Sequence, residues 1–152
     1  MSPDGRKLVA RNRKARHEFE IIDTLEVGIE LRGPEVKSIR AARLSFNDAY
    51  ASVRAGELWL HSLHVSPYKE AGEQNVDPVR SRRLLAHQRE IRGLATAVEE
   101  KGLTLVPLSV YFVRGRVKLE LGVARGRKLH DKREVIRRRE QDREARRAMR
   151  SG

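Results

Sequence analysis

The sequence predicts a mainly β protein, a small antiparallel β-barrel with peripheral helices, followed by a basic C-terminal tail. Apolar residues alternate with polar residues in about five segments, as in strands that bury one face. Two segments have helical spacing, and no regular succession of strand and helix indicates parallel βαβ units. The last two dozen or so residues are rich in arginine and poor in large apolar side chains, so they cannot form a core of their own.

The N-terminal part begins with a basic segment and continues into a strand. Residues 1–16 are polar and basic, which predicts a segment that is flexible until it contacts a partner. From Phe19 to Leu31 apolar residues recur at every second position, and Asp23 keeps the phase. This spacing predicts one long, bent strand with an apolar face.

A short helix and a hairpin are predicted next. The sequence Gly33-Pro34-Glu35 favours a helix start, because proline lacks an N–H that the first turn leaves unpaired and an acid is favoured by the helix dipole. Two alternating runs, at residues 49–53 and 58–65, flank a short turn and predict a β-hairpin.

The second half of the chain predicts a long loop, a helix and two strands. Gly102 follows the helical spacing at the position where glycine commonly ends a helix. Pro107 lies inside an apolar run and predicts a bulge or an unpaired edge, since proline cannot donate to a neighbouring strand. The elements are a loop at residues 66–80, a helix that ends at Lys101, and strands at 103–113 and 117–123.

The tail has a helical charge pattern without the means to fold alone. Glu134 with Arg138 and Asp142 with Arg146 lie one helical turn apart, and each such pair contributes a few tenths of a kcal/mol. These pairs do not offset the entropy of ordering the segment, so we expect it to be disordered alone and helical on a polyanion. The predicted division is a basic segment at 1–16, a barrel at 17–126 and the tail at 127–152.

The charge of the chain predicts a nucleic-acid partner. The sequence has 33 Lys and Arg against 21 Asp and Glu, a formal net charge of +12, and clustered positive charge attracts phosphates. An acidic membrane surface fits less well, because the tail lacks the broad apolar face of an interfacial helix. The absence of cysteine and of any long apolar run leads us to expect a cytoplasmic protein without a membrane partner.

Catalytic and metal sites find little support. His61 and His64 lie three residues apart on a predicted strand, so they face opposite sides and cannot share a metal ion. His130 and Asp131 could form the acid–base pair of a nuclease, but solvated or RNA-contacting side chains are far more common. We therefore predict a non-enzymatic RNA-binding protein with no metal or cofactor. A general RNA-binding barrel protein of the ribosome is the alternative.

Six segments carry a resemblance to a known family. They are NRKARHEFEI at 12–21, EVGIELRGPEVKSIRAARLSFNDAYASV at 26–53, GELWL at 56–60, DPVRSRRLLAHQREI at 77–91, GLTLVPLSVYF at 102–112 and KLELGVARGRKLHDKR at 118–133. In their order and spacing they resemble the SsrA-binding protein family, also called small protein B (SmpB). That family binds transfer-messenger RNA (tmRNA) in bacterial ribosome rescue.

The resemblance implies a fold, a function and partners. It implies an OB-like barrel that holds the tRNA-like domain of tmRNA and delivers it to stalled 70S ribosomes for trans-translation. EF-Tu would act indirectly, through alanyl-tmRNA. The tail would read the empty decoding centre and lie along the mRNA channel, and the protein would be a monomer in the cytoplasm.

The resemblance also assigns residues to two surfaces. Glu26 is an acid among mostly basic residues, and a carboxylate that faces RNA must accept hydrogen bonds from base or ribose donors. The implied tmRNA-binding residues are Asn12, His17, Glu26, Lys37, Arg40, Lys118, Arg125, Gly126, Arg127 and Lys128. The residues implied to meet the decoding centre and the mRNA channel are His130, Asp131, Lys132, Arg133, Arg137, Arg138, Arg143, Arg146 and Arg147.

Overall fold

The computed structural model describes residues 5–126 of the 152-residue chain. The strands in this range are β1 (Arg6–Arg11), β2 (Phe19–Ile29), β3 (Leu44–Ser45), β4 (Tyr50–Arg54), β5 (Glu57–His61), β6 (His64–Val65), β7 (Arg82–Leu85), β8 (Thr104–Val113) and β9 (Arg116–Gly126). The helices are α1 (Arg13–Glu18), α2 (Gly33–Arg40) and α3 (Gln88–Lys101), with a 3₁₀ turn η1 (Lys69–Gln74).

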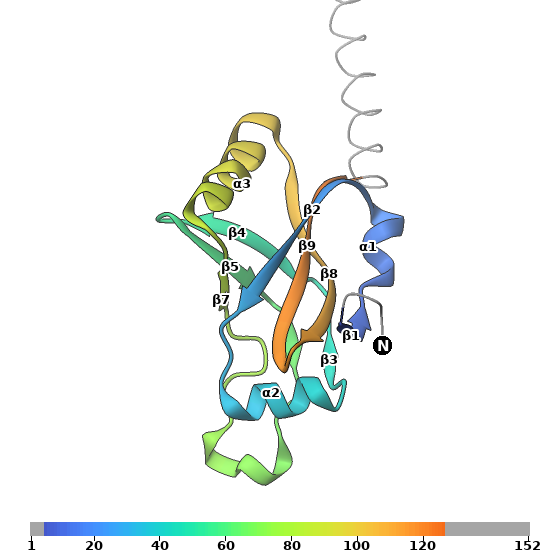
Figure 1. Cartoon of the computed structure of the whole chain (residues 1–152), viewed down its shortest axis with the longest axis vertical. Helices are drawn as coiled ribbons and strands as arrows, with labels where there is room; N and C mark the ends of the chain where they lie inside the picture. Colours follow the sequence, from blue (N-terminus) through green and yellow to red (C-terminus); the bar gives the residue numbers. More distant parts are fainter. Residues whose placement is uncertain (1–4, 127–152) are drawn as a thin grey trace, which may run out of the picture.

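The larger strands close into a ring (Figure 1). Their order is β8–β4–β5–β7–β2–β9, and β9 pairs back with β8. Each of these pairings is antiparallel. Because β8 is long, it pairs with β4 near its start and with β1 along its second half, so β1 is added outside the ring. The predicted antiparallel, mainly β fold with peripheral helices is confirmed.

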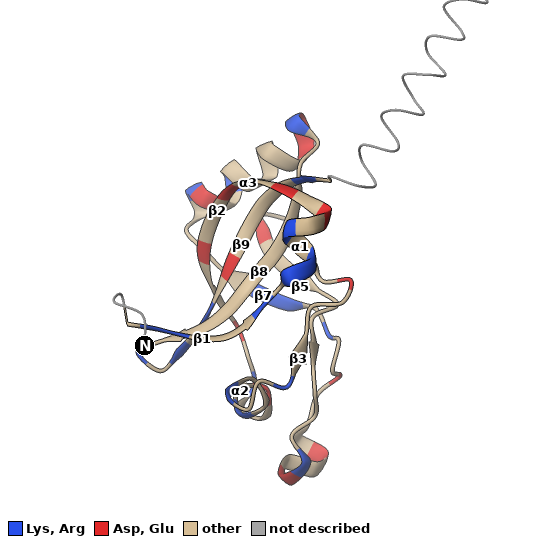
Figure 2. Cartoon of the chain, turned by 90° about the vertical axis from the view of Figure 1, so that its right-hand side faces the viewer, with Lys and Arg blue, Asp and Glu red and all other residues tan. Residues whose placement is uncertain are grey.

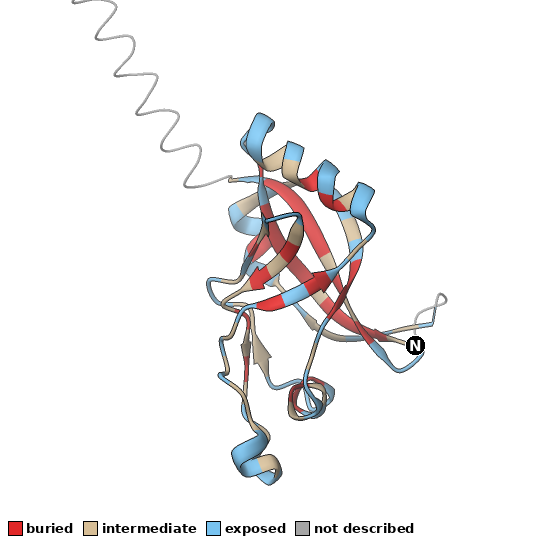
Figure 3. Cartoon of the chain, turned by 90° about the vertical axis from the view of Figure 1, so that its left-hand side faces the viewer, coloured by how far each residue is buried: buried red, intermediate tan, exposed pale blue. Residues whose placement is uncertain are grey.

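The helices cover the outside of the ring. Helices α2 and α3 lie at opposite ends of it, and α1 lies on the side of β8 (Figure 1). In α3 the buried residues Ile91 and Leu94 lie on one face, and the other face is exposed (Figure 3). This helix ends at Lys101 and is capped by Gly102, whose φ of 64° is the left-handed conformation common for glycine at this position. In the described part of the chain no helix is long and apolar enough to cross a membrane.

Two β-bulges separate the main core from a smaller outer cluster. The register of β2 shifts between Ile21 and Asp23, and that of β8 shifts between Pro107 and Ser109. One extra residue exchanges the two faces of a strand, so apolar residues before and after a shift pack on opposite sides. The bulge predicted at Pro107 is confirmed, whereas the unbroken phase predicted through Asp23 is wrong. The outer cluster contains Ala15, Phe19, Ile21, Val106, Leu108 and Ala124, and the main core includes Val27, Ile29, Leu105, Val110, Phe112, Leu119 and Leu121.

A buried ion pair fastens α2 to β7. Glu35 in the first turn of α2 is 4% exposed, and Arg82 of β7 is 0% exposed. Arg82 Nε donates to Glu35 Oε2 at 2.6 Å, and Arg82 Nη1 donates to the Leu63 carbonyl at 2.6 Å. Arg80 Nη2 donates to Glu35 Oε1 at 2.6 Å. Burial opposes ionisation of Glu35, but hydrogen bonds from Arg80, a backbone N–H and Arg82 outweigh it, and the pKa of Glu35 is lowered.

Some elements form where the sequence predicts none. Residues 1–16, for which the sequence predicts a flexible segment, contain β1 and the start of α1. Strand β1 forms because the second half of β8 offers it a free edge. Strand β7 was not predicted because two of its four residues, Arg82 and Arg83, are charged. The loop predicted at 66–80 is confirmed as irregular chain around η1.

Replacing Glu35 tests the buried ion pair. We expect Glu35→Gln to lower the free energy of unfolding at pH 7 by about 3–5 kcal/mol, because Arg82 is then buried without a counter-charge. Urea unfolding measures this value, and Glu99→Gln on the exposed side of α3 should change it by less than about 0.5 kcal/mol.

The same pair predicts a pH dependence. The pKa of Glu35 is lowered from 4.5, so its stabilising contribution is complete above pH 4.5 and is lost as the pH falls through the folded-state value. The stability difference between the wild type and Glu35→Gln should therefore shrink in acid. Equal stability of the two proteins at pH 7 would contradict the role of this pair.

Candidate nucleic-acid interface

The outer face of β2, β9 and β8 carries charged residues of both signs. Strand register places Glu26 opposite Glu120, and Lys118 lies between Gly28 of β2 and Tyr111 of β8. Figure 2 shows acidic positions on β2 and β9 beside basic positions on α1 and β1. Glu26 is exposed and Lys118 is partly exposed. The structure therefore brings the predicted residues Glu26 and Lys118 together on one surface.

Asn12 connects α1 to the ring. Its backbone N–H donates to the Leu108 carbonyl at 2.7 Å, and its side-chain Nδ2 donates to the Pro107 carbonyl at 2.8 Å. Its Oδ1 accepts a hydrogen bond from the Ala15 N–H at 3.3 Å, which caps α1. The side chain thus uses both its donor and its acceptor within the protein. Asn12 therefore positions α1 and the exposed His17 on that helix.

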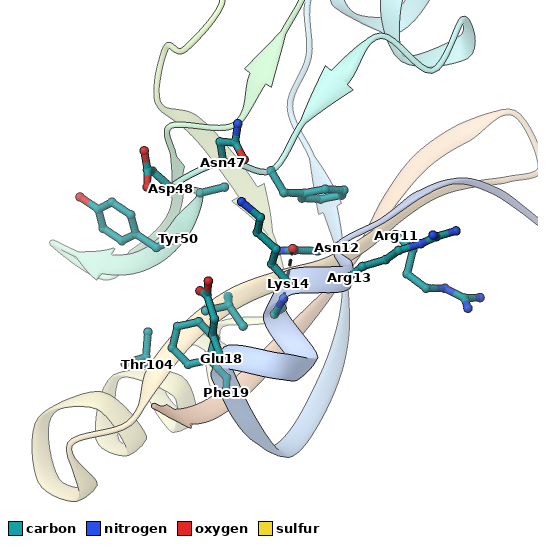
Figure 4. Close-up of a pocket in the computed structure, with 14 residues that line it drawn as sticks. Arg11, Asn12, Arg13, Lys14, Glu18, Phe19, Asn47, Asp48, Tyr50 and Thr104 are labelled. Carbon is teal, nitrogen blue, oxygen red and sulfur yellow. Dashed lines mark hydrogen bonds between the residues drawn. The ribbon is translucent and has the colours of Figure 1, made fainter. Parts of the chain in front are cut away.

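A cleft of about 730 Å³ lies between α1 and residues 46–50 (Figure 4). Lys14 and Glu18 line it from α1, and Asp48 and Tyr50 line it from the facing segment. Both basic and acidic side chains line this cleft, and the only predicted binding residue among them is Asn12, whose side chain already bonds within the protein. We therefore place the candidate interface on the outer face and on α2, where other predicted residues lie.

Helix α2 presents a cationic surface. Lys37 and Arg40 are exposed on it, whereas Arg43 lies beyond the end of the helix. Lys37 Nζ lies 5.2 Å from the centre of the Tyr68 ring, and Arg40 Cζ lies 5.5 Å from that of Phe112. These cation–π contacts hold the two side chains in place while they face solvent.

Helix α2 and β1 border a groove that the sequence did not predict. It has a volume of about 570 Å³, and its lining includes the apolar side chains of Leu8 and Phe112. Lys7, Arg40 and Arg114 also line it. The groove forms because β1 pairs with β8, and the prediction of a flexible N-terminal segment could not have revealed it.

The end of β9 is the last described part of the predicted site. Gly126 pairs with Phe19, and Arg125 Nη1 lies 3.8 Å from Glu20 Oε2 in an exposed ion pair. The other predicted residues lie outside the described residues, and they are Arg127, Lys128, His130, Asp131, Lys132, Arg133, Arg137, Arg138, Arg143, Arg146 and Arg147.

His61 on the ring has structural contacts. His61 Nε2 lies 2.7 Å from Ser52 Oγ, and His61 Nδ1 lies 2.8 Å from Ser81 Oγ. Burial, together with the nearby Arg54, lowers the pKa of His61. His64 lies on a different strand, β6, so the two do not share one strand as predicted. Within residues 5–126 no three His, Cys, Asp or Glu side chains are grouped so that they could hold a metal ion.

The sequence analysis did not predict three residues of the outer face, which are Arg16, Glu120 and Tyr111. Arg16 of α1 lies 3.7 Å from Glu120, and Tyr111 is buried beneath the guanidinium of Arg6. The alternation of β9 is a signal for Glu120, since it puts this residue on the same side as Lys118. No sequence signal distinguishes Tyr111 from a core aromatic residue.

A closed antiparallel ring with a cationic surface defines a class of small nucleic-acid-binding β proteins. The sequence matches the family described as SmpB protein over residues 9–151. The chain therefore belongs to the SmpB family.

Similar proteins agree with this assignment. The SsrA-binding protein of Synechococcus elongatus is 53% identical over 146 residues, which cover 95% of each chain. The SsrA-binding protein of Gloeothece citriformis is 54% identical over 144 residues, 94% of this chain and 93% of its own. A solved structure described as "tmRNA-SmpB: a journey to the center of the bacterial ribosome" matches with a TM-score of 0.69 and 49% identity. That match covers 86% of this chain and 95% of the other.

The contacts of Asn12 predict a structural role for its side chain. We expect Asn12→Ala to lower the free energy of unfolding by about 1–2 kcal/mol, because the helix loses its cap and the Pro107 carbonyl loses its donor. Chemical denaturation measures the change. His17→Ala, an exposed change on the same helix, should stay within about 0.5 kcal/mol of the wild type. If Asn12→Ala were as stable as His17→Ala, the side-chain contacts would not hold α1 in place.

Proposed function

We propose that this protein binds the tRNA-like domain of tmRNA and delivers it to stalled ribosomes for trans-translation. The family match over residues 9–151 carries this proposal. It is supported by the 49% identity to the chain in the tmRNA–SmpB structure and by the net charge of +12. In this function the protein is an adaptor and not an enzyme, because it holds and positions RNA without changing a covalent bond.

We assign tmRNA binding to the outer face and to α2. Glu26 and Lys118 on the outer face, with Lys37 and Arg40 on α2, combine hydrogen-bond acceptors with cations, as recognition of a folded RNA requires. His17 lies on the neighbouring α1, and Asn12 acts by holding that helix. Further binding residues in this proposal are Arg125, Gly126, Arg127 and Lys128.

We assign the ribosome to the C-terminal residues. The chain divides functionally into a ring at 17–126 that holds tmRNA, with the basic segment 1–16 attached through β1, and residues 127–152, which contact the decoding centre and the mRNA channel. The C-terminal residues are rich in arginine, which pairs with the phosphates of ribosomal RNA. The protein acts as a cytoplasmic monomer, and EF-Tu joins through alanyl-tmRNA.

A binding competition tests the choice of RNA. We expect the protein to prefer a folded tRNA-like domain of tmRNA over an unstructured RNA of equal length, because shape and spaced phosphates determine recognition. Filter binding at a fixed salt concentration measures both affinities. Equal affinity for the two RNAs would favour a general RNA-binding protein of the ribosome instead.

Truncation tests the division of labour. A chain that ends at Arg127 should keep most of its affinity for the tRNA-like domain but lose peptide tagging on stalled ribosomes. Its non-specific RNA binding should depend less steeply on salt, because fewer cations displace counterions. Affinity is measured by filter binding and tagging by translation of an mRNA without a stop codon. Simultaneous loss of both activities would refute the division.

A further inference from the structure

Two carboxylates face each other on the outer surface of the ring. Glu26 of β2 and Glu120 of β9 are in register, and like charges placed directly opposite destabilise a sheet. Arg16 Nη2 lies 3.7 Å from Glu120 Oε1 and reduces this repulsion on one side. The position of Glu26 is unfavourable both for the sheet and for the approach of RNA phosphates, unless its carboxylate has hydrogen-bond donors to accept from.

Tyr111 lies next to this pair of carboxylates. It is opposite Lys118 in the register of β8 and β9, and only 2% of it is exposed. The guanidinium carbon of Arg6 lies 4.8 Å from the centre of its ring and covers it. Burial raises the pKa of Tyr111, and the nearby carboxylates of Glu26 and Glu120 raise it further, so the phenol stays protonated and keeps its O–H as a donor.

The hydroxyl group of Tyr111 is buried without a hydrogen bond. Its oxygen makes no hydrogen bond of good geometry with any described residue, although the Glu26 carboxylate lies close enough to interact with the hydroxyl and raise its pKa. A buried hydroxyl without a partner costs free energy, and a phenyl ring would fill the same space without that cost. The next residue, Phe112, shows that β8 accommodates a phenyl ring in the main core. Packing alone therefore does not explain the hydroxyl of Tyr111.

We propose that the Tyr111 hydroxyl donates to the Glu26 carboxylate when RNA is bound and fixes its orientation. The remaining lone pairs of that carboxylate then accept N–H donors of an unpaired base or the O–H of a ribose. Tyr111 is thus a positioning residue that acts through Glu26 and does not touch the RNA. This inference rests on the proposed binding of the tRNA-like domain of tmRNA.

A double-mutant cycle tests this coupling. The variants are Tyr111→Phe, Glu26→Gln and both together, and filter binding measures their affinity for the tRNA-like domain of tmRNA. We expect Tyr111→Phe to weaken binding about five- to tenfold without loss of stability in urea, because it removes only an unpaired hydroxyl. The double variant should bind about as weakly as Glu26→Gln alone.

A second tyrosine variant serves as the control for the loss of a hydroxyl group. Tyr50→Phe removes a hydroxyl from an exposed tyrosine of β4 and should bind like the wild type. Wild-type affinity of Tyr111→Phe, or a double variant whose losses multiply, would overturn the inference. Failure of the wild type itself to prefer the tRNA-like domain would instead overturn the proposed function.

A spectroscopic measurement does not depend on affinity. In protein labelled with ¹³C at the tyrosine Cζ, addition of the tRNA-like domain should shift the Tyr111 signal in the wild type, because its hydroxyl gains an acceptor. The shift should be absent in Glu26→Gln at saturating RNA. An equal shift in both proteins would show that Tyr111 does not act through Glu26.

Discussion

The buried ion pair of Glu35 and Arg82 determines where α2 lies. An eight-residue helix has little stability of its own, so its position must come from tertiary contacts. Arg82 supplies them by binding Glu35 and the carbonyls of Leu63 and Pro78, which ties the helix to chain on both sides of η1. Lys37 and Arg40 are therefore held at one end of the ring by this polar contact together with Ile39, which α2 buries in the main core.

The bulges in β2 and β8 allow each of these strands to contribute side chains both to the main core and to the outer cluster. Without the shift near Pro107, Val106 and Leu108 could not pack outside the ring while Leu105 and Val110 fill the inside. The outer cluster supports α1, and the same strands carry Glu26 and Tyr111 on the outer face. The cationic and acidic residues of the candidate interface thus share strands with the core that keeps them in place.

The alternating strands and the C-terminal end of α3 were predictable because their signals are local. Gly102 and Pro107 act through their own backbone geometry, and alternation along β9 follows from one buried face. Contacts between distant segments were not predictable. Arg82 looks like a solvent residue until Glu35, 47 residues earlier, is placed beside it. Likewise Asn12 matches a binding motif, yet its side chain donates a hydrogen bond to the Pro107 carbonyl, which only the fold brings close to it.

The dependence of α1 on Asn12 has a consequence for motion. Six residues are too few to persist as an isolated helix, so α1 depends on the carbonyls that the bulged part of β8 offers to Asn12 and on the packing of Ala15 against the same strand. Helix and bulge consequently constitute one cooperative opening unit. Any fluctuation that straightens β8 near Pro107 also releases Arg13, Lys14 and Arg16 of α1. The local geometry of β8 is thereby linked to the positive electrostatic field on the side of the ring that α1 covers.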